Sequence, residues 1–171
     1  MVSLRHAFHH PAVERPTTSF RIVVYVTGGP DDHRLLEAVE KIAQRQNTHI
    51  TITYVVEVQQ SMPLDAELPG EIDRGEDVLR DAEVLASKLV GGKRENVRTE
   101  LLQARSAGAA IVDEAIETGA NAIMLSCTIR KKHGRVSVGD TVQYVLQHSP
   151  CEVIVIRQAM PNWVPDEGDR T

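Results

Sequence analysis

Two stretches of this chain combine residue types that can bind anions. The first, Thr27-Gly28-Gly29-Pro30-Asp31, joins an apolar run to a helical pattern. Paired glycines before a helix can let backbone amides approach a phosphate. The sequence contains neither GxGxxG nor GxxxxGK[ST], so the usual dinucleotide and P-loop motifs are absent. A tight strand-to-helix turn is the simpler interpretation of these glycines.

The second stretch lies between residues 126 and 141. Arg130, Lys131, Lys132 and Arg135 precede Gly139, which opens another helical pattern. Basic side chains near a helix N-terminus favour an anion. A solvated basic loop followed by a glycine turn is the alternative.

Catalytic and metal-binding patterns are poor. Cys127 and His133 are near in sequence, but no recognised Cys/His or GxSxG signature surrounds them, and a buried thiol is the favoured interpretation of Cys127. Cys127 and Cys151 lack zinc-ligand spacing, and His6, His9 and His10 have no ligand partner nearby. Asp113, Glu114 and Glu117 are expected on a solvated helix face. We therefore predict no catalytic residue and no metal.

Composition excludes several classes of protein. The chain has 171 residues, enough for about one domain, and its 19 basic and 24 acidic residues give a net charge of −5. This charge argues against a nucleic-acid backbone binder, and six aromatics are too few for a single-strand stacking platform. The apolar runs are too short for a signal peptide or a membrane span. Two free cysteines fit a reducing compartment, so we expect no membrane contact and a cytoplasmic protein.

The elements that must position these residues alternate along the chain. Short β-branched runs typical of buried strands alternate with helical stripes. Strands are expected at 20–27, 49–58, 97–104, 121–127 and 151–157, a loop at 59–72, and helices over 35–43, 78–89, 107–115 and 138–146. This order predicts an open parallel α/β sheet with helices on both faces and a ligand site beyond the ends of strands 1 and 4. Residues 1–19 are interpreted as an arm, 20–157 as the domain and 158–171 as a tail.

Several segments of the sequence resemble those of a known protein family. The first strand and turn, the segment Tyr54-Val55-Val56-Glu57 and above all residues 121–157 are similar to a universal stress protein domain. The resemblance covers about residues 20–157 and implies a sheet in the order 3-2-1-4-5. It also implies a homodimer through the last strand, with Val153, Ile154, Val155 and Ile156 at the edge, which would cover an apolar edge strand.

Members of that family that bind ATP carry Gly, two residues, Gly, nine residues, Gly and then Ser or Thr. The corresponding positions here are Ser126, Ile129, Gly139 and Asp140, and Thr27 stands where such members place an acidic residue. The candidate nucleotide site implied by family position comprises Thr27, Gly28, Gly29, Val55, Ser126, Ile129, Arg130, Gly139, Asp140 and Thr141.

The departures from the motif weaken a phosphate site. Ile129 replaces the conformational freedom of glycine by a β-branched side chain. Asp140 would place a like charge beside phosphate, at a cost of about 4 kcal/mol for a pair about 4 Å apart at an effective dielectric near 20.

Two main hypotheses follow. The first is a non-enzymatic, dimeric stress-response or regulatory domain that contacts an unidentified protein, has no cofactor and binds ATP weakly or not at all. The second is a member that binds ATP, AMP or another small anion in a rearranged pocket. A hydrolase built on Cys127 or His133 is a third, less favoured hypothesis.

Overall fold

The computed structural model describes residues 19–44, 47–89, 96–132 and 135–157. Within them, strands and helices alternate in the predicted order, with two additional short strands between β4 and α4. The predicted arm, apart from Ser19, and the predicted tail lie outside the described residues. The bounds are β1 Phe20–Tyr25, α1 Asp32–Ala43, β2 Thr48–Glu57, α2 Pro69–Leu89, β3 Val97–Ala104, α3 Ala107–Glu117, β4 Ala122–Cys127, β5 Arg130–Lys132, β6 Arg135–Ser137, α4 Asp140–His148 and β7 Glu152–Arg157.

The five longer strands form one parallel sheet in the order β3-β2-β1-β4-β7. This confirms the predicted fold and the order 3-2-1-4-5, with β7 as the fifth strand of the sheet. β3 lies at one edge and β7 lies at the other. The strand order reverses between β1 and β4, so the carboxyl ends of these strands flank the crevice where such sheets bind ligands.

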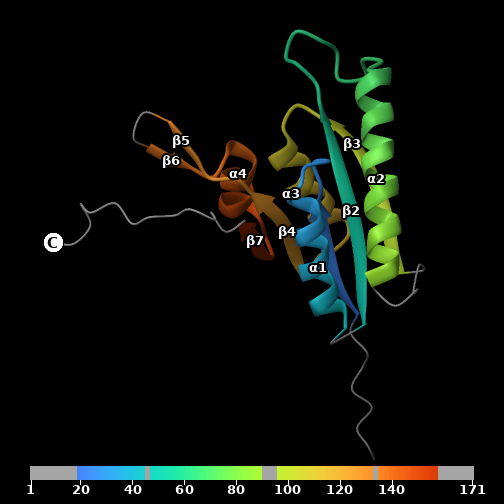
Figure 1. Ribbon diagram of the computed structural model, residues 1–171. Helices are drawn as coiled ribbons and strands as arrows, with labels where there is room; N and C mark the ends of the chain where they lie inside the picture. The colour runs from blue at the N-terminus through green and yellow to red at the C-terminus, as the bar shows by residue number, and fades with distance from the viewer. Residues whose placement is uncertain (1–18, 45–46, 90–95, 133–134, 158–171) are drawn as a thin grey trace, which may run out of the picture.

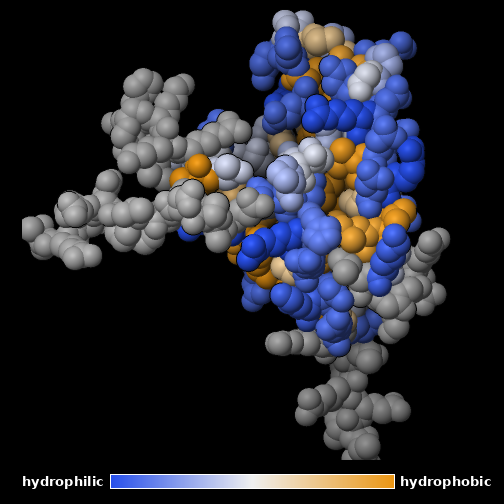
Figure 2. Space-filling model, viewed as in Figure 1, coloured by the Kyte–Doolittle hydropathy of each residue, from blue (hydrophilic) through white to orange (hydrophobic). Residues whose placement is uncertain are grey.

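Two helices cover each face of the sheet (Figure 1). Because side chains alternate along a strand, Ile22 and Val24 pack with Leu35 of α1, whereas Val23 packs with Ile111 of α3. Polar residues cover much of the face drawn in Figure 2, and apolar ones reach the surface mainly between α1 and α2. Among the described helices, none is long and apolar enough to cross a bilayer.

The structure corrects two predicted loops. Residues 69–72, assigned to a loop because of Pro69 and Gly70, form the first turn of α2. Proline is well suited to that position, since its missing N–H has no helical partner there. The basic segment 130–135 is not a loop throughout, because β5 and β6 form an antiparallel hairpin.

Two other expectations also change. α4 begins at Asp140, whereas the helix was predicted to include Val138. Glu114 was expected in solvent, but it is only 7% exposed and its carboxylate accepts a hydrogen bond from Arg98 at 2.9 Å. The burial predicted for Cys127 is confirmed, and Cys151 is partly buried.

Candidate functional site

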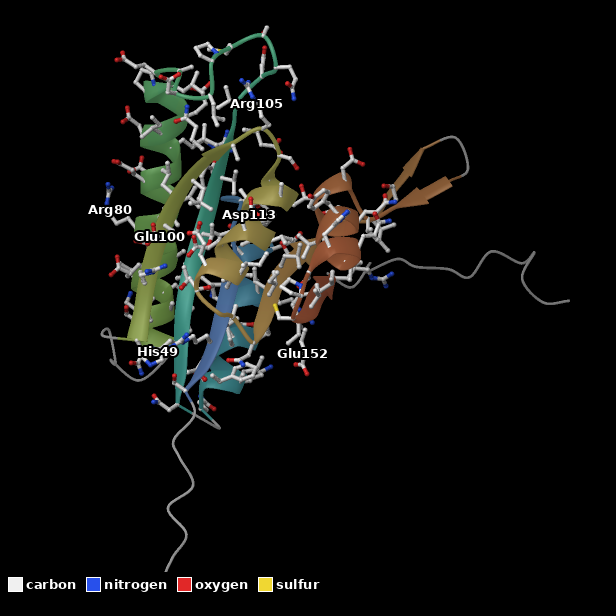
Figure 3. All side chains as sticks on the ribbon, turned by 180° about the vertical axis from the view of Figure 1, so that it is seen from behind. His49, Arg80, Glu100, Arg105, Asp113 and Glu152 are labelled. Atoms are coloured by element: carbon white, nitrogen blue, oxygen red, sulfur yellow. The ribbon has the colours of Figure 1, made fainter. Side chains whose placement is uncertain are left out.

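A cavity of about 610 Å³ opens at the carboxyl ends of β1 and β4. This is the end of the sheet where Arg105 follows β3 in Figure 3, opposite the end marked by His49. The cavity is bounded by the β1–α1 turn, the last residue of β2, the end of β4 and the first turn of α4. The predicted site residues that line it are Thr27, Gly29, Ser126, Gly139, Asp140 and Thr141.

Three predicted residues are not among those that line this cavity. Gly28 instead borders a smaller cavity of about 230 Å³ between α1 and α2. Val55 has a buried side chain within the core on the α3 side of the sheet. Ile129 is half-buried but lies outside the cavity lining. Arg130 begins β5, and its side chain is not among those that the structure describes.

The β1–α1 turn is held by a carboxylate of the chain itself. The Asp32 carboxylate accepts hydrogen bonds from the backbone N–H of Thr27 at 3.0 Å and of Gly28 at 2.7 Å. Asp31 occupies the N-cap position of α1 but makes no side-chain cap bond, and the neighbouring Asp32 bonds to the turn instead. These two amides are therefore already engaged by an anionic group of the protein.

Burial and hydrogen bonding act in opposite directions on this carboxylate. Burial raises the pKa of Asp32 above its ordinary value, while the bonds from the β1–α1 turn lower it less than burial raises it. Gly28 has φ +76°, and a Cβ there would lie 2.7 Å from Cγ2 of Val78 in α2. The first glycine of the pair thus serves close packing against a helix.

The α4 side of the cavity is more open. Gly139 is the N-cap residue of α4, with φ +91°, and a Cβ at this position would meet nothing within 4 Å. As a glycine, this N-cap residue makes no side-chain cap bond to the first turn of α4. Asp140 lies in that turn and is exposed, whereas Ser126 opposite is half-buried.

Four polar lining residues were missed by the sequence analysis: Tyr25, Asp31, Glu57 and Thr128. A Glu57 oxygen accepts the backbone N–H of Ala107 at 2.7 Å, which ties the end of β2 to the start of α3. Burial, followed by the nearby charge of Glu57, raises the pKa of Tyr25 to about 12, so its hydroxyl stays protonated at neutral pH. The position of Glu57 at the end of the strand beside β1 was the signal that could have revealed it.

The lining of the cavity is acidic. Its described residues include three carboxylates, Asp31, Glu57 and Asp140, and no lysine, arginine or histidine. Arg130, Lys131 and Lys132 form β5 and Arg135 begins β6, and Figure 1 shows these two strands projecting away from the five-stranded sheet.

The described residues assemble no cluster of three His, Cys, Asp or Glu side chains suited to a metal ion. Cys127 lines the cavity with its thiol largely buried. His133, its hypothetical catalytic partner, lies outside the described residues.

Comparison with known families agrees with this fold. The sequence model of the universal stress protein family matches residues 19–157, so the chain belongs to that family. No curated protein is a significant match to the sequence.

Solved structures of universal stress proteins share the same architecture. One from Archaeoglobus fulgidus superposes with a TM-score of 0.66 at 20% identity, covering 80% of this chain and 97% of that one. A second structure from that organism, in complex with dAMP, gives 0.62 at 19% identity over 80% and 96%. The protein UspA from Lactobacillus plantarum gives 0.63 at 26% identity over 81% and 97%.

Proposed function

We propose that this chain is a non-enzymatic regulatory member of the universal stress protein family that acts through protein contacts and binds ATP weakly or not at all. The observation that carries the proposal is the charge of the cavity, where three carboxylates and no basic side chain are found among the described lining residues. A nucleoside triphosphate would bring several negative charges into this acidic surrounding.

The shape of the β4 end supports the same conclusion. Ser126 occupies a family glycine position with a half-buried side chain that lines the cavity. Ile129 occupies the next one, and its side chain is also half-buried. Neither residue offers the bare backbone on which a phosphate chain could lie.

Because Asp140 is exposed, its contribution to the loss of ATP affinity is smaller than the sequence alone suggested. Because this carboxylate is exposed, the relevant dielectric is close to that of water, and a like charge about 4 Å away costs about 1 kcal/mol rather than about 4. Most of the loss of ATP affinity is therefore assigned to the other carboxylates and to the two missing glycines.

Isothermal titration with Mg·ATP tests the proposal. The unmodified protein should show no low-micromolar affinity, and Ser126→Gly, Ile129→Gly and Asp140→Ser together should raise ATP affinity at least tenfold. Asp140→Ser alone should give a smaller gain, and Asp113→Ser, an exposed carboxylate on α3, should give none. Low-micromolar ATP binding by the unmodified protein would refute the proposal, as would no gain in a triple variant whose circular dichroism is unchanged.

A second candidate function is binding of a nucleotide with fewer phosphates, such as AMP. It is favoured by the first turn of α4, which lines the cavity through Asp140 and Thr141 and whose N-cap residue Gly139 makes no side-chain cap bond, and by the dAMP complex of the Archaeoglobus protein. Nucleotide carried through purification and released on denaturation, together with a thermal shift with AMP, would favour this candidate over the first.

We also propose a homodimer through β7. Among the described strands β7 pairs with β4 alone, and Val153, Ile154, Val155 and Ile156 are each only partly buried. Pairing with a second copy would satisfy the free edge and cover these side chains. Light scattering coupled to gel filtration should give twice the mass of the 18.9-kDa chain; a monomer at micromolar concentration would refute the dimer.

A further inference from the structure

We propose that the outer edge of β3 binds an extended, basic segment of a partner protein, which joins the sheet as a further strand. This inference rests on the proposed function, in which the chain acts through protein contacts, and it names the surface and the chemistry of the partner. It is carried by an unpaired strand edge, by a groove along that edge and by the acidic wall of the groove.

The edge of β3 is open to a further strand. Among the described strands, β3 pairs with β2 alone. The N–H and C=O groups on its outer side therefore have no strand partner within the described part of the chain. An edge of this kind is a template onto which an extended peptide can add through main-chain hydrogen bonds.

A groove runs beside this edge. A cavity of about 400 Å³ lies between β3 and α3 and is lined in succession by Leu102, Gln103 and Ala104. Because successive side chains of a strand point to opposite faces of the sheet, a cavity that contacts all three lies beside the strand rather than on one face. The Gln103 amide donates to the backbone carbonyls of Leu64 at 2.7 Å and Ala66 at 2.9 Å. These bonds hold the segment before α2 at the groove, where Leu64 also lines it.

The α3 wall of the groove is acidic (Figure 3). Asp113, Glu114 and Glu117 line it, and Arg105 is the one basic residue in its described lining. Arg105 donates to two backbone carbonyls of the segment after β2 and to no carboxylate among the described residues. Glu114 pairs with Arg98 at 2.9 Å, whereas Asp113 and Glu117 are exposed and make no ion pair within the described part of the chain.

The two exposed carboxylates do not stabilise α3. Asp113 and Glu117 stand at positions i and i+4, where like charges repel. Glu117 is also the last residue of the helix, where the macrodipole disfavours a negative charge, and the last turn contains no basic residue. A basic partner would relieve this repulsion. A second copy paired edge to edge about a two-fold axis would instead bring two acidic grooves together.

Lysine and arginine side chains suit the groove. In an added strand, alternate side chains face the α3 side of the sheet. Their methylene stems can lie on Ala109 and Ala110, which line the groove, while the charged ends reach the carboxylates. The partner segment is therefore expected to carry basic residues at alternate positions.

Synthetic peptides test the inference by isothermal titration and by residue-resolved hydrogen exchange. The probe is a peptide as long as β3, 8 residues, in which Lys alternates with Val. Its controls are the same peptide with Glu in place of Lys, the Lys peptide with N-methylated amides along one edge, and spermine, a polycation without peptide groups. The Lys peptide should bind and slow the exchange of outward-facing amides of β3 but not those of β7. The Glu peptide and the N-methylated peptide should each bind about tenfold or more weakly.

Several results would overturn the inference. Spermine or the N-methylated peptide binding as well as the Lys peptide would show that charge alone is recognised. Protection of β7 in place of β3, or of the outward-facing β3 amides before any peptide is added, would show that this edge is not the open one. Absence of Lys-peptide binding would overturn the inference without bearing on ATP, which the nucleotide titration tests separately.

A charge reversal locates the site. Asp113→Lys with Glu117→Lys should abolish the preference for the Lys peptide and make the Glu peptide the tighter ligand. The variant is expected to fold, since Glu117→Lys places a positive charge where the macrodipole favours it. Asp73→Lys with Glu76→Lys makes the same change of charge at exposed positions of α2 and should leave the preference unchanged. Equal effects of the two double variants would contradict the groove as the binding surface.

Discussion

The two glycine turns at the cavity are built in opposite ways. After β1, the Gly28 amide is held by Asp32 and the residue packs against Val78 of α2. Before α4, a Cβ on Gly139 would meet no atom within 4 Å, and this N-cap residue makes no side-chain cap bond to the helix that follows. The comparison shows that the β1 turn serves folding, whereas the α4 turn is the part of the cavity where a change can alter ligand choice without disturbing the core.

The largest effect on this comparison should come from Gly28→Ala. An alanine at φ +76° is strained, and its Cβ would lie 2.7 Å from a methyl group of the stiff Val78 side chain. Strain and overpacking together should lower the free energy of unfolding by about 2–5 kcal/mol, measured by urea denaturation.

A double-mutant cycle separates the two causes. Val78→Ala should recover the part of the loss that comes from the clash and leave the part that comes from the backbone. Purely additive effects of Gly28→Ala and Val78→Ala would show that the close contact is not what requires glycine at this turn.

Gly139→Ala should have an intermediate effect. Its backbone is also strained for alanine, with φ +91° and ψ 152°, but the new methyl group meets no neighbour. The expected loss is about 1–3 kcal/mol, and Val78→Ala should not change it. A loss larger than that of Gly28→Ala would reverse the comparison.

The smallest effect concerns how the stability contributed by Asp32 at the β1–α1 turn depends on pH. Burial raises the pKa of Asp32, so the folded state binds this proton more tightly than the unfolded state. The stabilisation that comes from this proton is fully present below the ordinary carboxyl pKa, near 4. It is lost as the pH rises through the raised pKa of the folded state. Asp32→Asn should therefore flatten this part of a plot of unfolding free energy against pH.

Glu114 supplies the matched control for that titration. Burial raises the pKa of Glu114 as well, while Arg98 opposes the shift. Glu114→Gln should therefore remove a second, independent part of the decrease in unfolding free energy that occurs as the pH rises. If the profile of Asp32→Asn matched that of the unmodified protein, the carboxylate at the β1 turn would not be linked to stability.

Much of the fold could be predicted because its signals are local. β1 and β4 are nearly continuous apolar runs, and the placement of ligands at strand ends follows from parallel topology. The start of α2 at Pro69 was missed because Pro-Gly also marks loops, and only the following helical turn distinguishes the two. The β5–β6 hairpin has strands too short for an alternating pattern to appear.

The site was predicted in part for the same reason. Family spacing indicated Ser126, Gly139 and Asp140, and all three line the cavity, because they stand near the end of a strand or at the start of a helix. The sequence could not indicate that Asp32 would occupy the amides of the β1 turn, because that contact depends on how the helix axis meets the strand. The buried oxygen of Asp31 that has no partner among the described residues likewise depends on packing rather than on spacing.

The hydrogen bond between Glu57 and Ala107 limits how this cavity can diversify. The Glu57 carboxylate faces the cavity and at the same time holds the first amide of α3. Replacing it by a basic residue that could bind a phosphate would remove the partner of that amide, although Ser106 would still cap the helix. Asp140 is exposed in the first turn of α4 and has no comparable structural role among the described contacts. Part of the negative charge of the cavity is therefore required by the fold itself. Substitutions that change ligand preference are expected to be tolerated better at the start of α4 than at the end of β2.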